Sequence, residues 1–109
     1  MRNTRMKAIA CEISRGGFSD ERVFSIPVNG QNYQGVASRR HMWTRDGRII
    51  EDGEPPLGKV IPGLIAARIL EIKDEDIATV SIPDGEVITI PVSQLLDRPT
   101  VGEHVSLGS

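Results

Sequence analysis

Alternating apolar and polar residues between positions 77 and 92 predict a β-hairpin. Pro83 fixes φ at about −65° and Asp84 bonds to local backbone, so these two residues favour a type I turn. Gly85 then takes the left-handed position of a three-residue loop with a bulge. A two-residue turn would shift the pairing by one residue and mix the two faces. In the bulged register one face is wholly apolar, made of Ala78, Val80, Ile82, Ile88, Ile90 and Val92.

The first half of the chain has the same period of two and predicts three more strands, at residues 7–14, 21–28 and 31–37. Asn29-Gly30 favours a two-residue hairpin turn between the second and the third of them. In that register Phe24 lies opposite Gly35, and Ile26 lies opposite Tyr33. The Phe24 ring can therefore cover a strand glycine that has no side chain of its own.

Short matches between the two halves indicate an internal duplication of a three-stranded meander of about 35 residues. Ser25-Ile26-Pro27 recurs as Ser81-Ile82-Pro83. Further matches at similar spacing are Gly30 with Gly85, Ser38 with Ser93, and Glu12-Ile13 with Glu71-Ile72. Chance similarity between two hairpins is the alternative, because the identities are few. The predicted halves cover residues 7–42 and 64–98, with a linker at 43–63.

The segment 64–72 is ambiguous, because its Leu, Ala, Arg and Glu residues are good helix formers. Its counterpart near the N-terminus is a strand, and Pro62-Gly63 suits the entry to a strand. We therefore predict a strand, with a helix as the alternative, followed by a tight polar turn at 73–76. Beyond the hairpin we expect one helical turn at 93–96 and a closing strand at 104–107.

These elements predict one all-β domain over residues 1–109. It is either a small barrel or a pair of packed meanders, with an internal pseudo-repeat and six or seven strands. Short strands, tight turns and a one-turn helix before the last strand resemble the SH3-like small β-barrels of translation factors and reader domains. The resemblance covers mainly residues 60–107 and concerns the topology and the spacing of strands and turns along the chain. The aromatic cage of reader domains is absent, so the resemblance implies a fold and no ligand residues.

Composition favours a protein of a reducing compartment. One cysteine excludes an internal disulfide, and together with two histidines it gives no zinc-binding spacing. The basic N-terminal residues are not followed by the apolar core of a signal peptide. No stretch approaches the roughly 20 apolar residues of a membrane span. We therefore expect a cytoplasmic protein that does not associate with membranes.

The net charge of −2 hides opposite charges in the two halves of the chain. Residues 1–48 contain nine Lys and Arg against four Asp and Glu, whereas residues 49–109 contain four against eleven. Such asymmetry can mark a nucleic-acid-binding face. The alternative is attraction between the two halves, within one fold or across a homodimer. We favour this alternative, because the positive excess is modest for a nucleic-acid-binding protein.

No arrangement of side chains indicates catalysis, so we expect a protein that is not an enzyme and needs no cofactor. Cys11 shares a strand face with Ile9 and Ile13, which predicts a core position and not a nucleophile. Acidic clusters at 51–54 and 74–76 fall in predicted turns, where solvent surrounds them. The second cluster lacks the spacing of a calcium loop. We therefore predict no catalytic residue and no metal ligand, and a hydrolase or transferase is the least favoured class.

The strongest candidate site is the basic segment, residues 39–48, which combines four arginines with His41 and the only tryptophan. Guanidinium groups contact phosphates, and an exposed indole ring stacks on bases. The candidate nucleic-acid-binding residues are therefore Arg39, Arg40, Trp43, Arg45 and Arg48. The alternative is an ordinary surface turn, in which Trp43 covers an open end of the core and the arginines pair with nearby acidic residues.

The sequence thus favours a non-enzymatic binding or assembly module. An RNA-binding or ribosome-associated barrel that uses the basic segment is the alternative. A meander of short strands also leaves unpaired strand edges, and such edges allow two copies of the chain to pair as a homodimer. The sequence does not identify a protein partner.

Overall fold

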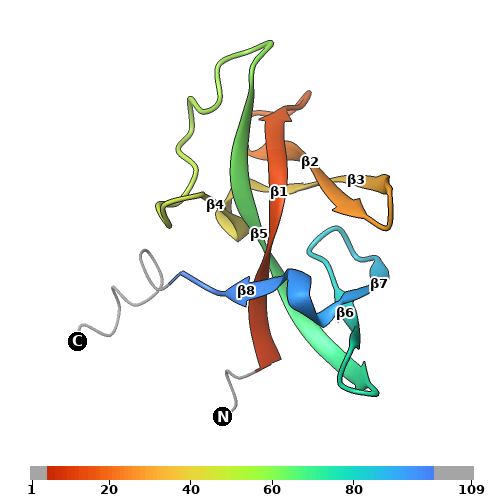
Figure 1. Cartoon of the computed structure of the whole chain (residues 1–109). Coiled ribbons are helices and arrows are strands. Elements are labelled where there is room, and N and C mark those ends of the chain that lie inside the picture. Colours follow the sequence, from red (N-terminus) through yellow and green to blue (C-terminus); the bar gives the residue numbers. More distant parts are fainter. Residues whose placement is uncertain (1–4, 100–109) are drawn as a thin grey trace, which may run out of the picture.

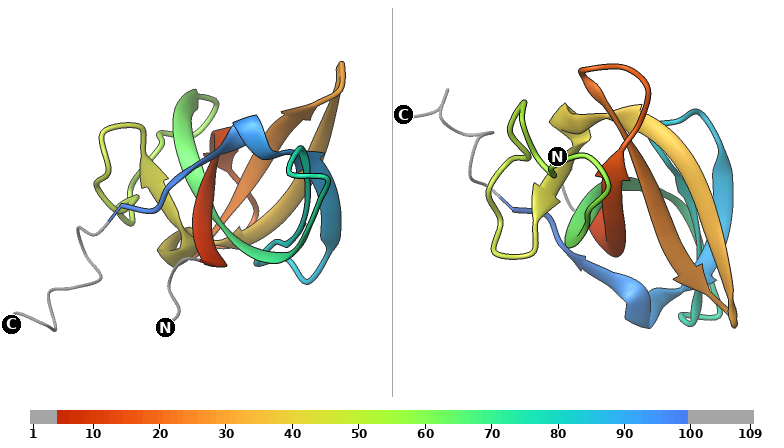
Figure 2. Two further views of the ribbon diagram at one scale, coloured as in Figure 1. Left: turned by 60° about the horizontal axis from the view of Figure 1, so that its bottom comes forward. Right: turned by 90° about the horizontal axis from the view of Figure 1, so that it is seen from above.

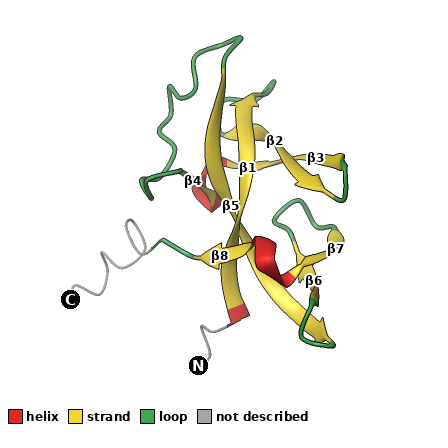
Figure 3. Ribbon diagram, viewed as in Figure 1, coloured by secondary structure: helices red, strands yellow, loops and turns green. Residues whose placement is uncertain are grey.

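The computed structural model describes residues 5–99 and confirms the predicted all-β class. Eight strands form one antiparallel sheet that curls into half a barrel (Figure 1). The prediction of six or seven strands missed the two shortest, β4 and β8. Two one-turn helices interrupt the sheet, η2 (Arg39–His41) and η3 (Val92–Gln94) (Figure 3). The second overlaps the helical turn predicted at 93–96, but Leu95 and Leu96 lie in a strand. The strands are β1 (Met6–Arg15), β2 (Glu21–Val28), β3 (Gln31–Ser38), β4 (Met42–Thr44), β5 (Val60–Lys73), β6 (Ile77–Ser81), β7 (Val87–Pro91) and β8 (Leu95–Asp97).

Two long antiparallel strands, β1 and β5, form the centre of the sheet, whose order is β3-β2-β1-β5-β6-β7. Each central strand begins a meander of three strands, so the halves of the chain lie on opposite sides of the β1/β5 pair. The strand predicted at 64–72 is confirmed within β5, and the helix alternative is wrong. Its residues 64–67 are all buried, because both faces of β5 are covered there. The closing strand predicted at 104–107 lies outside the described residues.

Each half is completed by a short strand from the other half. β4 follows the first meander and pairs with β5 of the second, with Met42 opposite Ile65. β8 follows the second meander and pairs with β1 of the first, with Leu95 opposite Ile9. Ile9 and Ile65 are themselves partners in the β1/β5 ladder. The strand pairing therefore has an approximate two-fold symmetry centred on this pair.

The ladder registers define which residues of the two halves correspond. Glu12 pairs with Ser25 in the first half, and Arg68 pairs with Ser81 in the second. This supports the predicted match of Ser25-Ile26-Pro27 with Ser81-Ile82-Pro83. It also makes Arg68 the counterpart of Glu12, so the match of Glu12 with Glu71 is wrong by three residues. The bulge between Ile69 and Glu71 leaves one residue, Leu70, without a partner in β6.

The hairpin predicted between residues 77 and 92 has the predicted register. Val80 lies opposite Ile88, and Ala78 lies opposite Ile90. The Ile82 N–H donates to the Glu86 carbonyl at 2.9 Å, which closes the three-residue loop. Gly85 has φ +94°, as the bulged turn requires. The hairpin thus buries the predicted apolar face and leaves Thr79, Ser81 and Thr89 on the other side.

Replacing Gly85 with valine should lower the free energy of unfolding by about 1–2 kcal/mol. The open space around the Gly85 Cα would admit a side chain, so the expected loss comes from the positive φ alone. Urea denaturation of the two proteins measures the difference. Gly53→Val is the control, because Gly53 also lies in open space but has no positive φ. Equal losses in both variants would contradict this explanation.

The main core lies inside the curled sheet and contains the inward side chains of both meanders. Phe24 lies opposite Gly35 as predicted, and a Cβ at Gly35 would approach the Phe24 ring to 2.7 Å. The β6–β7 hairpin comes close to β3 as the sheet curls (Figure 2). There the Tyr33 hydroxyl donates to the Asp84 carboxylate at 2.6 Å. A second cluster, on the outer face of β1 and β5, contains Ala8, Trp43, Leu64 and Ala66.

Arg22 fixes the irregular linker that precedes β5. Its guanidinium is fully buried on the inner face of β2 and donates five hydrogen bonds, all to backbone carbonyl oxygens. Three of the acceptors belong to the linker and two lie near the start of β2: Glu51, Asp52, Glu54, Ser19 and Glu21. Arg15 adds bonds to the carbonyls of Gly53 and Pro55. Two arginines of the first half thus hold the linker through its backbone carbonyls.

Strands β3 and β7 are each paired along one edge only, as far as residues 5–99 are concerned. Self-association through these edges therefore stays a prediction, which light scattering of the purified chain would test. The described part of the chain contains no helix of the length and apolar character that crossing a membrane requires.

Candidate functional site

The structure places Trp43 in the protein interior. Only 2% of its surface is exposed, and it packs with Leu64 and Ala66 on the outer face of β5. The guanidinium of Arg98 lies over the indole ring, 5.6 Å from its centroid. Trp43 therefore offers no exposed face to a base and belongs to the second cluster, on the outer face of β1 and β5.

Two arginines of the basic segment pair with Asp20. Arg39 Nε lies 3.0 Å from one carboxylate oxygen, and Arg40 Nε lies 3.8 Å from the other. Arg39 also donates to the carbonyl of Ile50 at 3.0 Å and is mostly buried. Arg40 keeps 73% of its side chain exposed, so it is the more accessible of the two.

The other two arginines of the segment are also engaged within the fold. Arg48 forms a two-pronged ion pair with the Glu54 carboxylate, with both N···O distances 2.9 Å. Arg45 donates to the backbone carbonyls of Gly63 and Cys11. The structure therefore does not gather the five predicted residues on one exposed face. Phosphate binding by the exposed guanidinium atoms stays a prediction.

The hydrogen bonds from Arg48, together with one from the Glu51 N–H, lower the pKa of Glu54 to about 2. In the unfolded chain the pKa would be about 4.5. The ionised Glu54 therefore stabilises the fold above pH 4.5, and this contribution is lost as the pH falls from 4.5 towards 2.

A Glu54→Gln variant should consequently be less stable than the native chain at pH 7, and the difference should shrink below pH 4.5. Urea denaturation of both proteins at a series of pH values measures this. Glu12→Gln is the control, because Glu12 is exposed and no ion pair involves it among residues 5–99. Parallel pH profiles for the native chain and Glu54→Gln would refute the role of this ion pair.

Cys11 occupies the predicted core position, with 2% of its surface exposed. Burial raises the pKa of its thiol to about 12, so the reactive thiolate is scarce near neutral pH. Among residues 5–99 no group of three or more His, Cys, Asp or Glu side chains is arranged to hold a metal ion.

A gap in the strand pairing leaves a pocket beside β5. Along the outer edge of β5, the ladder with β4 ends at Ile65 and the ladder with β6 begins at Arg68. Ala66 and Ala67 lie between them without a ladder partner on this edge. We call this place the β5 gap. A cavity of about 220 Å³ occupies it.

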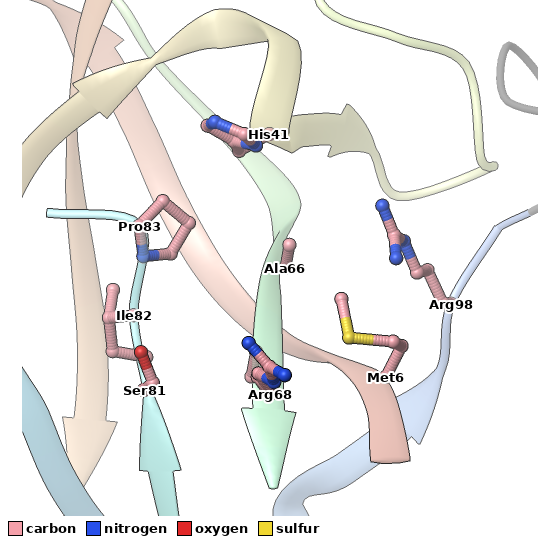
Figure 4. A pocket seen from close by; sticks show the side chains of 9 residues that line it. Met6, His41, Ala66, Arg68, Ser81, Ile82, Pro83 and Arg98 are labelled. Atoms are coloured by element: carbon pink, nitrogen blue, oxygen red, sulfur yellow. The ribbon is translucent and has the colours of Figure 1, made fainter. Parts of the chain in front are cut away.

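Polar and apolar side chains surround the β5 gap in distinct places. Met6, Ile82 and Pro83 give it apolar walls, while His41, Arg68, Ser81 and Arg98 bring donor groups. Figure 4 shows that His41 and Arg68 lie on opposite sides of Ala66, with Arg98 and Met6 on a third side. No Asp or Glu lines the cavity.

Most of these donor groups are not used by the fold. The side chains of His41, Arg68 and Ser81 make no hydrogen bond or ion pair with any residue between 5 and 99. Arg68 and Ser81 are direct partners across the β5/β6 ladder, so their side chains leave the same face of the sheet. The site therefore presents available donors beside an apolar floor, the usual composition of a ligand pocket.

The two-fold arrangement supplies an equivalent place on β1, which we call the β1 gap. It lies at Ala10 and Cys11, between the β8 ladder ending at Ile9 and the β2 ladder beginning at Glu12. Here the side-chain amide of Gln94 donates to the Pro27 carbonyl at 2.8 Å and spans the gap.

Sequence reasoning found His41 as a member of the basic segment but missed Arg68, Ser81 and Arg98. Arg68 and Ser81 become neighbours only through the long-range pairing of β5 with β6. The repeat of Ser25-Ile26-Pro27 at residues 81–83 singles out Ser81 in the sequence. The repeat alone does not show that Ser81 pairs with Arg68.

Comparison of the chain with protein-family models, with curated proteins and with solved structures finds no match.

Proposed function

We propose that this protein is a non-enzymatic binding module and that its ligand enters the β5 gap. The observation that supports the proposal is a cavity of about 220 Å³ whose donors, His41, Arg68 and Ser81, are unused by the described fold. The volume is below the range of about 300–1,000 Å³ typical of drug-sized ligands. A compact ligand, or one end of a larger ligand, fits such a site.

The SH3-like description of the barrel belongs to the same proposal. The one-turn helix η3 before the short strand β8 supports it, as does the sequence of small strands joined by tight turns. SH3-like barrels carry many functions, so this description adds no ligand by itself.

Chemical-shift mapping tests the proposed function. The ¹⁵N-labelled full chain is titrated with a panel of compact neutral, cationic and anionic fragments. Saturable shifts should concentrate at the amide signals of Ala66, Ala67 and Ser81. The β1 gap serves as an internal control, through the signals of Ala10, Cys11 and Ser25. Shifts that are absent, scattered, or equal at the two gaps would refute the proposal.

RNA binding is the second candidate function. It is supported by the exposure of Arg40, which directly precedes His41 of the β5 gap. Phosphate contacts would then carry the affinity, without stacking on Trp43. The test is fluorescence anisotropy of a labelled mixed-sequence RNA at low salt, with the native chain and an Arg39→Glu, Arg40→Glu variant. Equal affinity for both proteins would remove this candidate.

A further inference from the structure

We infer that the ligand of the β5 gap carries a compact tetrahedral oxyanion, of the phosphate or sulfate type. The inference rests on the proposed function and names its ligand class. It begins from charge: the lining contains two arginines and a histidine, and no Asp or Glu is among the lining residues. An anionic group is the partner that such a set of side chains favours.

The geometry favours a tetrahedral anion over a planar carboxylate. The unused donors lie in different directions, since His41 and Arg68 lie on opposite sides of Ala66 and Ser81 lies on the neighbouring strand β6 (Figure 4). The Ser81 hydroxyl accompanies Arg68 across the ladder. A phosphate or sulfate group offers acceptor oxygens in all these directions, whereas a carboxylate offers two oxygens in one plane. Guanidinium forks also match a phosphate with two parallel hydrogen bonds.

The β1 gap, which the approximate two-fold symmetry relates to the β5 gap, is closed by a side chain. Glu12 stands there in the place of Arg68, and Gln94 stands in the place of His41. Gln94 is bonded to the Pro27 carbonyl, whereas no hydrogen bond joins His41 to Pro83, the counterpart of Pro27. One gap is therefore spanned and carries an acidic residue, while the other is open and basic.

The arginines of the two gaps extend the comparison. Counting from Met42 and Leu95, which occupy equivalent ladder positions, Arg45 corresponds to Arg98. Arg45 donates to the carbonyls of Cys11 and Gly63, which are partners in the β1/β5 ladder. Its counterpart Arg98 lines the β5 cavity with its guanidinium over the ring of Trp43. The two gaps thus differ in charge at Glu12 and Arg68 and share an arginine at Arg45 and Arg98.

Calorimetry and chemical-shift titration of the full chain test this inference, with sodium phosphate, sodium sulfate, phenyl phosphate and sodium acetate at low ionic strength. Phosphate and sulfate should bind at least fivefold more tightly than acetate. Phenyl phosphate should bind most tightly, because its ring can contact the walls formed by Met6, Ile82 and Pro83. The amide signals of Ala66, Ala67 and Ser81 should follow the titration.

Two variants with the same change of net charge distinguish anion binding at the β5 gap from general electrostatic attraction of anions to the protein. Arg68→Ala should weaken phosphate binding at least tenfold, whereas Arg40→Ala, whose side chain pairs with Asp20, should change it less than twofold. Both residues are exposed, so both variants should keep the native unfolding temperature. Equal weakening in the two variants would show adventitious binding of the anion only and would overturn the inference.

The remaining outcomes distinguish the inference from the proposed function. If neutral fragments bind the β5 gap and phosphate and sulfate do not, the proposed function stands and the oxyanion inference fails. If nothing binds there, both fail. A short RNA could instead bind at least tenfold more tightly than phenyl phosphate and lose affinity equally in Arg40→Ala and Arg68→Ala. That result would show a polynucleotide-binding surface and would overturn the inference that the ligand is a compact oxyanion.

Discussion

Replacing Arg22 with alanine should lower the free energy of unfolding by about 3–5 kcal/mol. The buried guanidinium donates five hydrogen bonds to backbone carbonyl oxygens, and Arg22 is the only buried polar or charged residue among residues 5–99. Without Arg22 these carbonyls either stay unsatisfied or reach water by releasing the linker from the sheet. Urea or guanidinium denaturation at neutral pH measures the loss.

Two further variants show whether the bonds of Arg22 or its charge matter. Arg22→Lys keeps the charge but can donate at most three hydrogen bonds, so its stability should fall between those of the native chain and Arg22→Ala. Arg40→Ala removes a mostly exposed arginine and should stay within about 0.5 kcal/mol of the native chain. A loss below about 1 kcal/mol for Arg22→Ala would mean that the linker does not depend on it.

Replacing Trp43 with alanine should also destabilise the fold, by about 3–5 kcal/mol. The ring is buried against β1 and β5 and forms the largest part of the outer cluster. Its indole N–H has no hydrogen-bond partner among residues 5–99. Trp43→Phe should therefore retain much of the stability, because that change removes ring area and no hydrogen bond from the described fold. Thermal and urea unfolding of the three proteins give the comparison.

Fluorescence of the native chain tests the buried position of Trp43 directly. Its emission should lie at short wavelength, acrylamide should quench it weakly, and RNA should leave it unchanged. Phe18→Ala is the control for stability, because Phe18 is 72% exposed and its loss should change unfolding by less than about 0.5 kcal/mol. Strong quenching by RNA, or a Trp43→Ala variant as stable as the native chain, would mean that the ring is exposed in solution.

Local chemistry was sufficient to predict both hairpins with their registers. Asn29-Gly30 and Gly85 both have positive φ, which L-residues with larger side chains resist, so each turn fixes the pairing of the strands beside it. Once a register is fixed, the alternation of side chains decides which residues enter the core. This is why the buried face of the second hairpin and the position of Phe24 opposite Gly35 could be read directly from the sequence.

Arg22 could have been found by the same reasoning. It has the same parity as Phe24 and Ile26 along β2, so alternation alone predicts an arginine on the buried face. Trp43 gave no such indication. β4 has only three residues and belongs to a region of the sheet that is covered on both faces, so Met42 and Trp43 are both buried and no alternation is visible.

The β5 gap could not be predicted, because it depends on where two ladders stop. β4 and β6 come from different halves of the chain, and each ends its pairing with β5 for local reasons. The space between them is a property of the assembled sheet. The basic segment drew attention through composition, while its arginines are mostly occupied by acidic side chains and carbonyl oxygens.

The crossed placement of β4 and β8 has a consequence for cooperativity. In repeat proteins built as stacked units, each unit contacts its neighbours only and can unfold in part. Here the outer edge of β1 needs a strand from the end of the chain, and the outer edge of β5 needs a strand from its middle. Neither meander keeps all its strand partners when the other opens. A chain with two similar halves is therefore expected to melt in a single step, like one indivisible unit.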